Sequence, residues 1–214
     1  MQILDLKNTY KHLYLPSAKA PELVEVPDFQ FLMIDGAIEP GQEPGNSPAF
    51  AAAFQAIYGA AYTLKFMLKK RKENPVDYPI MAMEGLWWVE DGQFEISRKD
   101  NWSWRLMVMT PEVVTPDLFE AALQQLRQKR PGPGLERLRL EHFAEGLCVQ
   151  IMHIGPYSDE PRTVERMRSF AAEQGYALSG MHHEIYLGDP RRAQPEKLKT
   201  ALRHPVQAMA LPVT

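Results

Sequence analysis

The stretch Met181-His-His-Glu-Ile-Tyr-Leu187 is typical of a β-strand, and it has a counterpart in the first half of the chain. That counterpart, Met81-Ala-Met-Glu84, lies 100 positions earlier, in the apolar and aromatic run that ends at Val89. Each stretch is preceded by a helical pattern and followed by an aromatic residue. Because so short an identity arises easily by chance, the shared order of elements carries more weight than the letters. That order predicts two equivalent halves.

The predicted order in each half is strand, helix, strand, strand. In the first half the strands are predicted at 26–35, 78–89 and 101–109, with a helix at 49–71 that Ser47-Pro48 begins. In the second half the strands are predicted at 146–154, 181–187 and 200–210, with a helix at 159–174. A helix at 115–130 and the linker Pro131-Gly-Pro-Gly134 join the halves. Residues 1–27, broken by three prolines, predict an irregular arm with one short strand.

The predicted fold class is α+β, with duplicated strand-helix-strand-strand units at about 27–110 and 135–210. These units are expected to form one pseudo-symmetric domain over residues 1–214. Helices that cover one face of an antiparallel sheet leave the other face open, and two such sheets side by side make a groove. We therefore expect the ligand site in a groove on the face opposite the helices.

Composition excludes several classes of function. The chain has 24 Lys+Arg against 27 Asp+Glu, a formal charge of -3, and so lacks the basic excess typical of nucleic-acid binding. No stretch reaches the 18 or more continuous apolar residues of a spanning helix, so no membrane partner is expected. The single cysteine, Cys148, cannot form an intrachain disulfide and is expected to be a buried small hydrophobe. The first residues lack a signal-peptide core, which predicts a cytoplasmic protein.

Strand alternation selects the groove residues of the second half. His182, Glu184 and Tyr186 share one side of their strand, while Ile185 and Leu187 belong on the other side, against the helices. Glutamate is disfavoured in strands, and one flanked by bulky residues indicates a partly desolvated carboxylate with a perturbed pKa. The competing interpretation is an ordinary solvated carboxylate on an exposed sheet face.

In the first half, the same alternation places Glu84 and Trp88 on one side, and we assign Trp88 to the groove. Glu84 is either a second pocket carboxylate or the partner of an arginine such as Arg105. Trp104, which shares a face with Trp102, is also assigned to the groove. Each tryptophan taken alone is better explained by core or sheet packing, whereas four tryptophans within eighteen positions favour a site.

The sequence favours a site without metal or cofactor. Adjacent strand residues point to opposite faces, so His182 and His183 cannot hold one ion together. His153 is the histidine that could join His182 across the sheet, and we count it among the groove residues. There is no G-x-S-x-G elbow, P-loop or dinucleotide fingerprint.

Several longer motifs resemble those of a known family. They are His182-His-Glu-Ile-Tyr-Leu-Gly-Asp-Pro-Arg-Arg192, Pro195-Glu-Lys-Leu-Lys-Thr200, Asp5-Leu-Lys, Tyr10-Lys-His-Leu-Tyr14 and Met83-Glu-Gly-Leu-Trp-Trp88. Over nearly the whole chain they resemble the stand-alone branch of the GyrI-like small-molecule-binding family. The resemblance implies a duplicated strand-helix-strand-strand fold. It also implies a link to hydrolysis of the cyclopropane of DNA-alkylating cyclopropanoid antibiotics, although other relatives sense drugs in regulators or bind gyrase.

The resemblance implies roles for particular residues. The family's central pocket glutamate falls on Glu184, and the aromatic residues around it include Tyr186, Trp88 and Trp104. Tyr157, in Gly155-Pro-Tyr157, resembles the tyrosine that follows the first strand of a repeat. The first half has Gly36-Ala-Ile at that place, so only one end of the groove would carry a hydroxyl.

The implied chemistry also makes sense without the family. A spirocyclopropane conjugated to a dienone opens when a nucleophile attacks its methylene while negative charge builds on the carbonyl oxygen. A carboxylate can accept a proton from the attacking water, and a tyrosine hydroxyl can donate to the developing oxyanion. The resemblance and this chemistry together imply a detoxifying hydrolase of cyclopropanoid or similarly strained electrophilic aromatic compounds, in which Glu184 activates water and Tyr157 or Tyr186 assists. The alternative is a non-catalytic module that binds or senses planar, often cationic, aromatic drugs.

Overall fold

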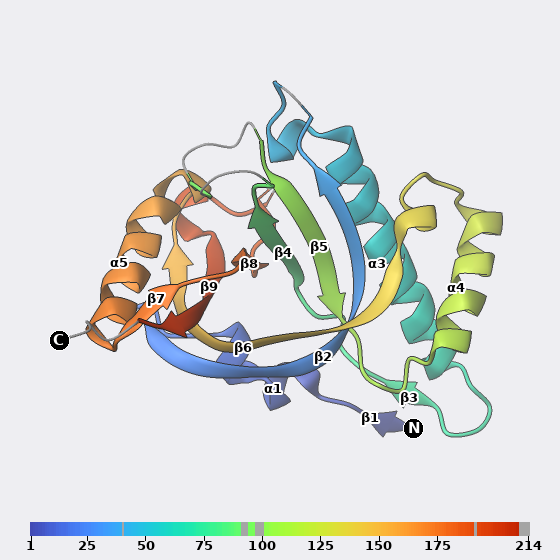
Figure 1. Cartoon of the computed structure of the whole chain (residues 1–214). Coiled ribbons are helices and arrows are strands. Elements are labelled where there is room, and N and C mark those ends of the chain that lie inside the picture. The colour runs from blue at the N-terminus through green and yellow to red at the C-terminus, as the bar shows by residue number, and fades with distance from the viewer. Residues whose placement is uncertain (40, 91–93, 97–100, 191, 210–214) are drawn as a thin grey trace.

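The computed structural model of the chain describes residues 1–39, 41–90, 94–96, 101–190 and 192–209 (Figure 1). Its strands are β1 (Gln2–Ile3), β2 (Glu22–Ala37), β3 (Val76–Asp77), β4 (Met83–Trp88), β5 (Ser103–Met109), β6 (Arg139–Ile154), β7 (Tyr176–Leu178), β8 (His182–Tyr186) and β9 (Lys199–Ala208). Its α-helices are α1 (Leu6–Thr9), α2 (Lys11–Tyr14), α3 (Pro48–Lys69), α4 (Pro116–Lys129) and α5 (Glu160–Glu173). Short 3₁₀ helices are η1 (Pro44–Asn46), η2 (Leu135–Arg137), η3 (Tyr157–Asp159) and η4 (Pro195–Lys197).

The main sheet is an antiparallel barrel. Its strands follow the order β6-β2-β5-β4-β8-β9, and β9 pairs back onto β6, so the six strands close on themselves. β7 extends β9 at one corner, and β1 pairs with β3 in a separate parallel ribbon. Closure leaves the barrel with an inner and an outer face, which alternate along each strand.

The duplicated order predicted from the sequence is confirmed. The first unit is β2-α3-β4-β5 and the second is β6-α5-β8-β9, while α4 lies between them in the chain. The two units meet along the β4–β8 and β2–β6 pairings (Figure 1). In the β4–β8 pair Gly85 lies opposite Glu184, so the two equivalent strands run side by side at the middle of the molecule.

The helix starts follow from the caps that the sequence contains. Ser47 accepts a hydrogen bond from the backbone N–H of Phe50 and is followed by Pro48 at the first helical position of α3. Thr115 and Pro116 begin α4 in the same way. None of the helices in the described part of the chain combines the length and the apolar character that crossing a membrane would need.

Two strands are much longer than predicted. β2 and β6 have 16 residues each, and they curve along the whole barrel as partners of one another. Gly146, with φ of +75°, lies inside β6 rather than at its start, and this left-handed conformation accommodates the bend of a continuing strand. The N-terminal arm forms β1, α1 and α2 before β2 begins. Residue 210, the predicted end of the last strand, lies outside the described residues.

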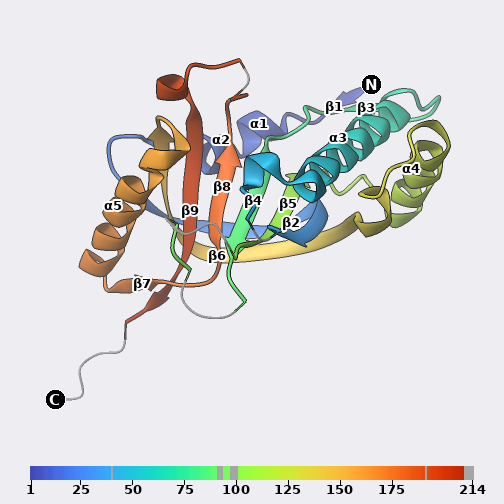
Figure 2. The ribbon, with the colours of Figure 1, turned by 90° about the horizontal axis from the view of Figure 1, so that it is seen from above.

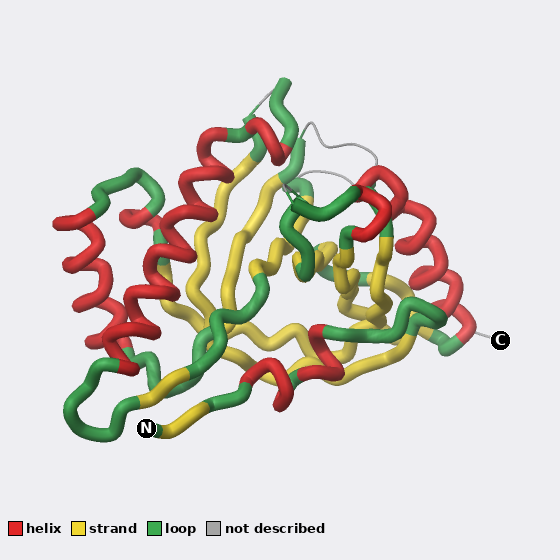
Figure 3. The backbone as a smooth tube through the Cα atoms, turned by 180° about the vertical axis from the view of Figure 1, so that it is seen from behind, coloured by secondary structure: helices red, strands yellow, loops and turns green. Residues whose placement is uncertain are grey.

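Helices α3 and α5 both pack on the outer face of the barrel (Figures 2 and 3). α5 contributes Val164 and Met167 to a small core with Val149, Ile151 and Leu202 of β6 and β9. The longer α3 covers β2 and β5 and also packs against α4. The outer face between these two helices lies over β4 and β8, the strands from which the sequence analysis drew most of its candidate residues.

Gly36 positions a tryptophan beside this region. Trp104 is fully buried, and its ring lies flat against Gly36, where an added Cβ would overlap the indole carbons. Trp104 is also the direct cross-strand partner of Gly36 in the β2–β5 pair. The glycine is therefore required by the close approach of the ring rather than by backbone conformation.

Candidate functional site

A cavity of about 830 Å³ opens on the outer face of the barrel between α3 and the start of α5. Its floor is the β4–β8 pair, and its walls come from α3, η3 and the loop at 187–190. The residues that line it are Pro44, Phe50, Ala51, Phe54, Gln55, Tyr58, Tyr62, Met83, Trp87, Ile96, Trp102, Tyr157, Glu160, Glu184, Tyr186, Leu187, Gly188, Asp189 and Pro190. The volume suits a drug-sized molecule.

The predicted position of the groove is corrected in one respect. The cavity lies on the same face of the sheet as α3 and α5, whereas the sequence analysis placed the groove on the opposite face. The reason is the closure of the sheet, because the opposite face becomes the barrel interior and is filled by side chains. The space for a ligand is the gap that the two helices leave between them.

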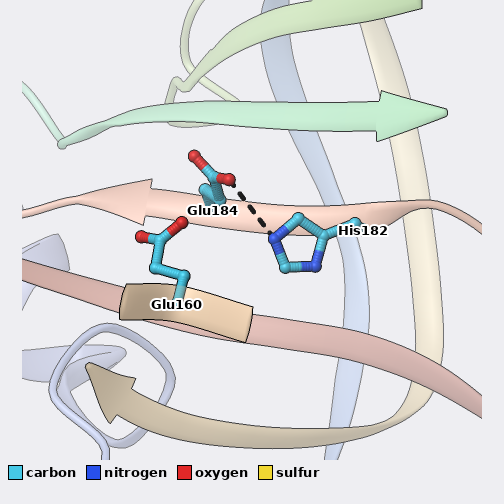
Figure 4. Close-up of side chains that lie close together, drawn as sticks. All are labelled: Glu160, His182 and Glu184. Carbon is cyan, nitrogen blue, oxygen red and sulfur yellow. Dashed lines mark ion pairs between the residues drawn. The ribbon is translucent and has the colours of Figure 1, made fainter. Parts of the chain in front are cut away.

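Glu184 projects from the floor of the cavity and is only 6% exposed. Its cross-strand partner is Gly85, and a Cβ there would lie 2.8 Å from the Tyr186 hydroxyl, so the glycine leaves room for the polar groups of β8. One carboxylate oxygen lies 3.3 Å from Nε2 of His182 (Figure 4). The predicted shared face of His182, Glu184 and Tyr186 is therefore present in the structure.

Glu160 brings a second carboxylate to this point. It lies in the first turn of α5, is 2% exposed, and faces Glu184 and His182 (Figure 4). One donor atom from each of the three residues lies within 4.8 Å of the others. Two carboxylates and an imidazole form a donor set that a divalent metal ion accepts. The expectation of a metal-free site rested on the histidines and the single cysteine rather than on carboxylates, and it stays a prediction.

His182 has an apolar and aromatic setting. Its ring stacks on Phe94 with centroids 5.7 Å apart and lies 5.5 Å from the ring of His204. Neither ring nitrogen of His182 makes a hydrogen bond to any residue that the structure describes. Burial and the neighbouring His182 lower the pKa of His204 to about 4, so His204 is neutral at physiological pH.

Two tyrosine hydroxyls face the carboxylates. The Tyr186 hydroxyl accepts a hydrogen bond from the Trp87 indole at 3.1 Å, and burial together with Glu184 raises the pKa of Tyr186 well above its ordinary value. Burial and the charge of Glu184 raise the pKa of Tyr157 to about 12. The two rings meet edge to face with centroids 6.2 Å apart. Both hydroxyls therefore stay protonated at neutral pH and can donate.

The aromatic wall of the cavity is built from Trp87, Trp102 and Phe50. The ring of Phe50 stacks on Trp87 at 5.6 Å, and Trp87 lies 5.2 Å from Trp102. These three rings, of which Phe50 and Trp87 are stacked and Trp102 is tilted by 54° from Trp87, place an apolar wall beside the carboxylates.

The groove assignment of Trp88 is corrected by the strand register. Trp87 pairs directly with His182, so Trp87 shares the cavity face and Trp88 lies on the other side. The Trp88 indole donates instead to Glu90 at 2.8 Å. Trp104 is on the cavity side but lies beneath Phe50, fully buried, and does not line the cavity.

Glu84 lies inside the barrel, and its assignment to the pocket is also corrected. It accepts hydrogen bonds from the Tyr14 hydroxyl at 2.5 Å and from Nε2 of His183 at 3.0 Å. The alternative partner, Arg105, forms a two-pronged ion pair with Asp35, at 2.6 and 2.9 Å. Glu84 and Glu184 are equivalent in the two units, but they project to opposite faces.

A polar network continues from Glu84 through the barrel interior. Nδ1 of His183 lies 2.9 Å from Glu145, and Arg203 donates to Glu145 at 3.3 Å and to the Leu13 carbonyl at 2.6 Å. Burial opposes ionisation of Glu145, but the charges of His183 and Arg203 outweigh it and lower the pKa of Glu145 to about 2. Burial also opposes protonation of His183, but Glu145 and Glu84 raise its pKa to about 9. His183 is therefore a buried imidazolium.

His153 supports the site from outside the cavity. Its Nδ1 lies 2.8 Å from the Thr163 hydroxyl of α5, and its Nε2 lies 3.2 Å from the Pro156 carbonyl. It therefore fixes the turn that carries Tyr157 against α5, and it is not among the cavity residues. The sequence left open that His153 joins His182 across the sheet, but both ring nitrogens of His153 contact Thr163 and Pro156 instead.

Replacing Trp87 by Ala is expected to weaken the binding of a planar aromatic ligand by about 1–3 kcal/mol, because the cavity wall loses its indole and Phe50 loses the ring on which it stacks. Trp88→Ala is the matched control on the same strand and should leave the affinity unchanged. Fluorescence titration with a planar dye, after circular dichroism has shown that both variants are folded, measures the difference. A larger loss with Trp88→Ala would contradict the register assigned here.

The family comparison agrees with this geometry. The family model of the GyrI-like small molecule binding domain matches residues 19–207. A solved structure of a hydrolase from Listeria innocua is 37% identical, covers 97% of this chain and 100% of its own, and has a TM-score of 0.84. An uncharacterized conserved protein from Listeria innocua is 38% identical over 95% of this chain and 100% of its own, with a TM-score of 0.86.

More distant structures share the fold alone. The C-terminal domain of EcmrR is 11% identical over 88% of this chain and 98% of its own, with a TM-score of 0.51. Among curated proteins the same kind of comparison finds no significant match. The match of the family model over most of the chain, together with the duplicated barrel and its cavity, shows that the chain belongs to the GyrI-like small-molecule-binding family.

Proposed function

We propose that this chain is a hydrolase that opens the cyclopropane of cyclopropanoid, DNA-alkylating-type compounds by addition of water. The observation that carries the proposal is the position of Glu184, a buried carboxylate at the floor of an aromatic cavity with two tyrosine hydroxyls beside it. The similarity to Listeria innocua proteins described as hydrolases supports it. Such turnover would detoxify the compound, because the alkylating group is destroyed.

Glu184 is assigned the role of general base. The water oxygen forms a bond to the cyclopropane methylene, and the ring C–C bond breaks with its electron pair moving through the dienone to the carbonyl oxygen. Glu184 accepts a proton from the attacking water, and a proton delivered to the phenolate completes the product. Proton transfer of this kind contributes about 10²- to 10⁴-fold to the rate.

Tyr157 and Tyr186 are assigned the role of hydrogen-bond donors to the carbonyl oxygen, on which negative charge develops. Both remain protonated donors at neutral pH, because burial and the nearby carboxylates raise the pKa of each. A hydrogen bond that strengthens as the carbonyl becomes a phenolate stabilises the transition state more than the ground state. The Trp87 indole, which donates to Tyr186, holds that hydroxyl in place.

The second candidate is a module that binds planar, often cationic, aromatic drugs without turnover. The observation that favours it is the same cavity, because a carboxylate inside an aromatic wall attracts a planar cation. The two functions differ in what happens to the ligand, so a binding measurement alone does not separate them.

Mass spectrometry of a cyclopropanoid incubated with the purified protein separates the two functions. A hydrolase is expected to yield a ring-opened alcohol about 18 Da heavier than the substrate, in amounts that exceed the protein. A sample treated with EDTA is expected to give the same yield, since the mechanism uses no metal. Unchanged compound recovered from the protein would overturn the hydrolase in favour of the binding module, and loss of turnover on chelation would overturn the metal-free mechanism.

A further inference from the structure

Helices α3 and α4 lie side by side (Figure 1), and residues of both helices line a second groove of about 1070 Å³. The loop at 131–134 closes one side of it, and Gly134 packs so tightly on α3 that a Cβ would lie 2.8 Å from the Ala52 carbonyl oxygen. The residues that line it are Ala52, Gln55, Ala56, Tyr58, Gly59, Tyr62, Thr63, Phe66, Met67, Lys70, Gln125, Leu126, Lys129, Arg130, Pro131, Gly132, Pro133, Gly134 and Leu135.

This groove borders the Glu184 cavity. Three residues of α3, Gln55, Tyr58 and Tyr62, line both spaces. The groove and the cavity are therefore neighbours along α3.

An aromatic ladder on α3 joins the two spaces. Phe54, Tyr58, Tyr62 and Phe66 recur every four residues, which places them on one face of the helix. Neighbouring rings lie 5.0 Å apart for Phe54 and Tyr58, and 6.4 Å apart for Tyr58 and Tyr62. Tyr62 and Phe66 are 50% and 47% exposed, so both rings offer open faces. Twelve residues of helix give the ladder a length of about 18 Å.

Positive charges lie at both ends of the groove. Lys129 and Arg130 lie beside the loop at 131–134, which packs on the N-terminal half of α3, whereas Lys70 lies at the C-terminal end of α3. No acidic residue is among the described lining residues, and none of the three cations forms an ion pair within the described part of the chain. The ammonium of Lys70 lies 5.7 Å from the centre of the Phe66 ring, so a ligand that reaches this end would meet an aromatic ring and a cation together.

We propose that the α3–α4 groove is a second subsite of the Glu184 cavity and binds the aromatic tail of an elongated ligand whose far end carries a carboxylate. The inference rests on the proposed function for the identity of the bound head group and extends it to the substrate class. The shared lining residues place the groove beside the cavity, and Lys70, next to Phe66, gives charge complementarity at the C-terminal end of α3. The head of the ligand would lie at Glu184 and its acidic end beside Lys70.

Two probes of different length test the subsite. The long probe is a planar bis-benzimidazole with a terminal carboxylate, and the short probe is its single-benzimidazole half without the carboxylate. The wild-type protein is expected to bind the long probe at least about 10-fold more tightly than the short one, because the second ring system stacks on the ladder. Equal affinities for the two probes would overturn the proposal.

Variants identify the residues that give the long probe its higher affinity. Phe66→Ala and Lys70→Gln should each weaken binding of the long probe about 5-fold or more and change the short probe by less than about two-fold. Lys69→Gln is the matched control, because the neighbouring Lys69 pairs with Asp77 and does not line the groove. Losses that are equal for both probes, or equal for Lys69→Gln and Lys70→Gln, would contradict the subsite.

Failure of the subsite proposal can be distinguished from failure of the proposed hydrolase function. Phe66→Ala should leave the turnover of a compact cyclopropanoid, limited to the alkylating head, unchanged. If the wild type turns over this compound but shows no preference for the long probe, the subsite is wrong and the hydrolase stands. Preference for the long probe without any turnover supports the subsite and contradicts the hydrolase. A wild-type dimer in gel filtration that Phe66→Ala converts to monomer would assign the groove to a second copy and overturn the proposal.

Discussion

Glu184→Gln is expected to lower kcat for cyclopropane opening by about 10²-fold or more, while a neutral ligand still binds. The substitution keeps the size of the side chain but removes its charge and its ability to accept a proton from water. Binding of a planar cation should weaken at the same time, because its counter-charge in the cavity is lost. Steady-state kinetics by product mass, together with titration of a neutral and a cationic dye, measures both effects.

The turnover of the Glu184→Gln variant also decides whether Glu184 or another carboxylate is the base. Near-normal turnover by Glu184→Gln would show that the base lies elsewhere. By sequence equivalence Glu84 would be the next candidate, but the structure places Glu84 inside the barrel and brings Glu160 to the cavity instead. Glu160→Gln is therefore the variant to compare. If both variants turned over normally, carboxylate catalysis in this cavity would be abandoned.

Arg203→Met is expected to lower the free energy of unfolding by about 3–5 kcal/mol, because it leaves Glu145 charged and poorly paired inside the barrel. The arginine is 3% exposed and also donates to the Leu13 carbonyl, which ties the N-terminal arm to β9. Equilibrium denaturation in urea, followed by tryptophan fluorescence, measures the loss.

Arg127→Met is the matched control for this prediction. Arg127 pairs with Glu136 on the exposed surface, where solvent screens the interaction, so its removal should leave the urea midpoint almost unchanged. Equal midpoints for the Arg203 and Arg127 variants would show that the interior network contributes little, and would contradict the role given to it here.

Helix caps and residue periodicity predicted the helices and strands because each signal depends only on residues close together in the sequence. Ser47-Pro48 and Thr115-Pro116 carry the caps of α3 and α4, and each helix begins where its cap predicts. The sequence also predicted the order of the elements, since strand and helix patterns have different periods. It did not predict the closure of the barrel, because closure depends on pairing β6 with both β2 and β9, and no local pattern specifies such distant partners.

The sequence placed residues on the cavity side correctly for β8, where alternation groups Glu184 with Tyr186, but not for β4. On β8, alternation placed Glu184 and Tyr186 together, and the structure has both in the cavity, although their catalytic roles stay predictions. On β4 both faces are buried, so alternation could not choose between Trp87 and Trp88. Glu160 was missed because it comes from a helix start. Its one sequence signal was a glutamate at the start of the predicted helix, just after Gly155-Pro-Tyr157.

Alternation along the five residues of β8 gives its inward and outward side chains different roles. His183 belongs to the ionic network inside the barrel, whereas Glu184 and Tyr186 face the cavity. Substitutions on the outward positions can therefore abolish binding or turnover without disturbing the charges inside the barrel. A library of variants of this strand should divide into folded proteins that have lost activity and proteins that have lost the fold.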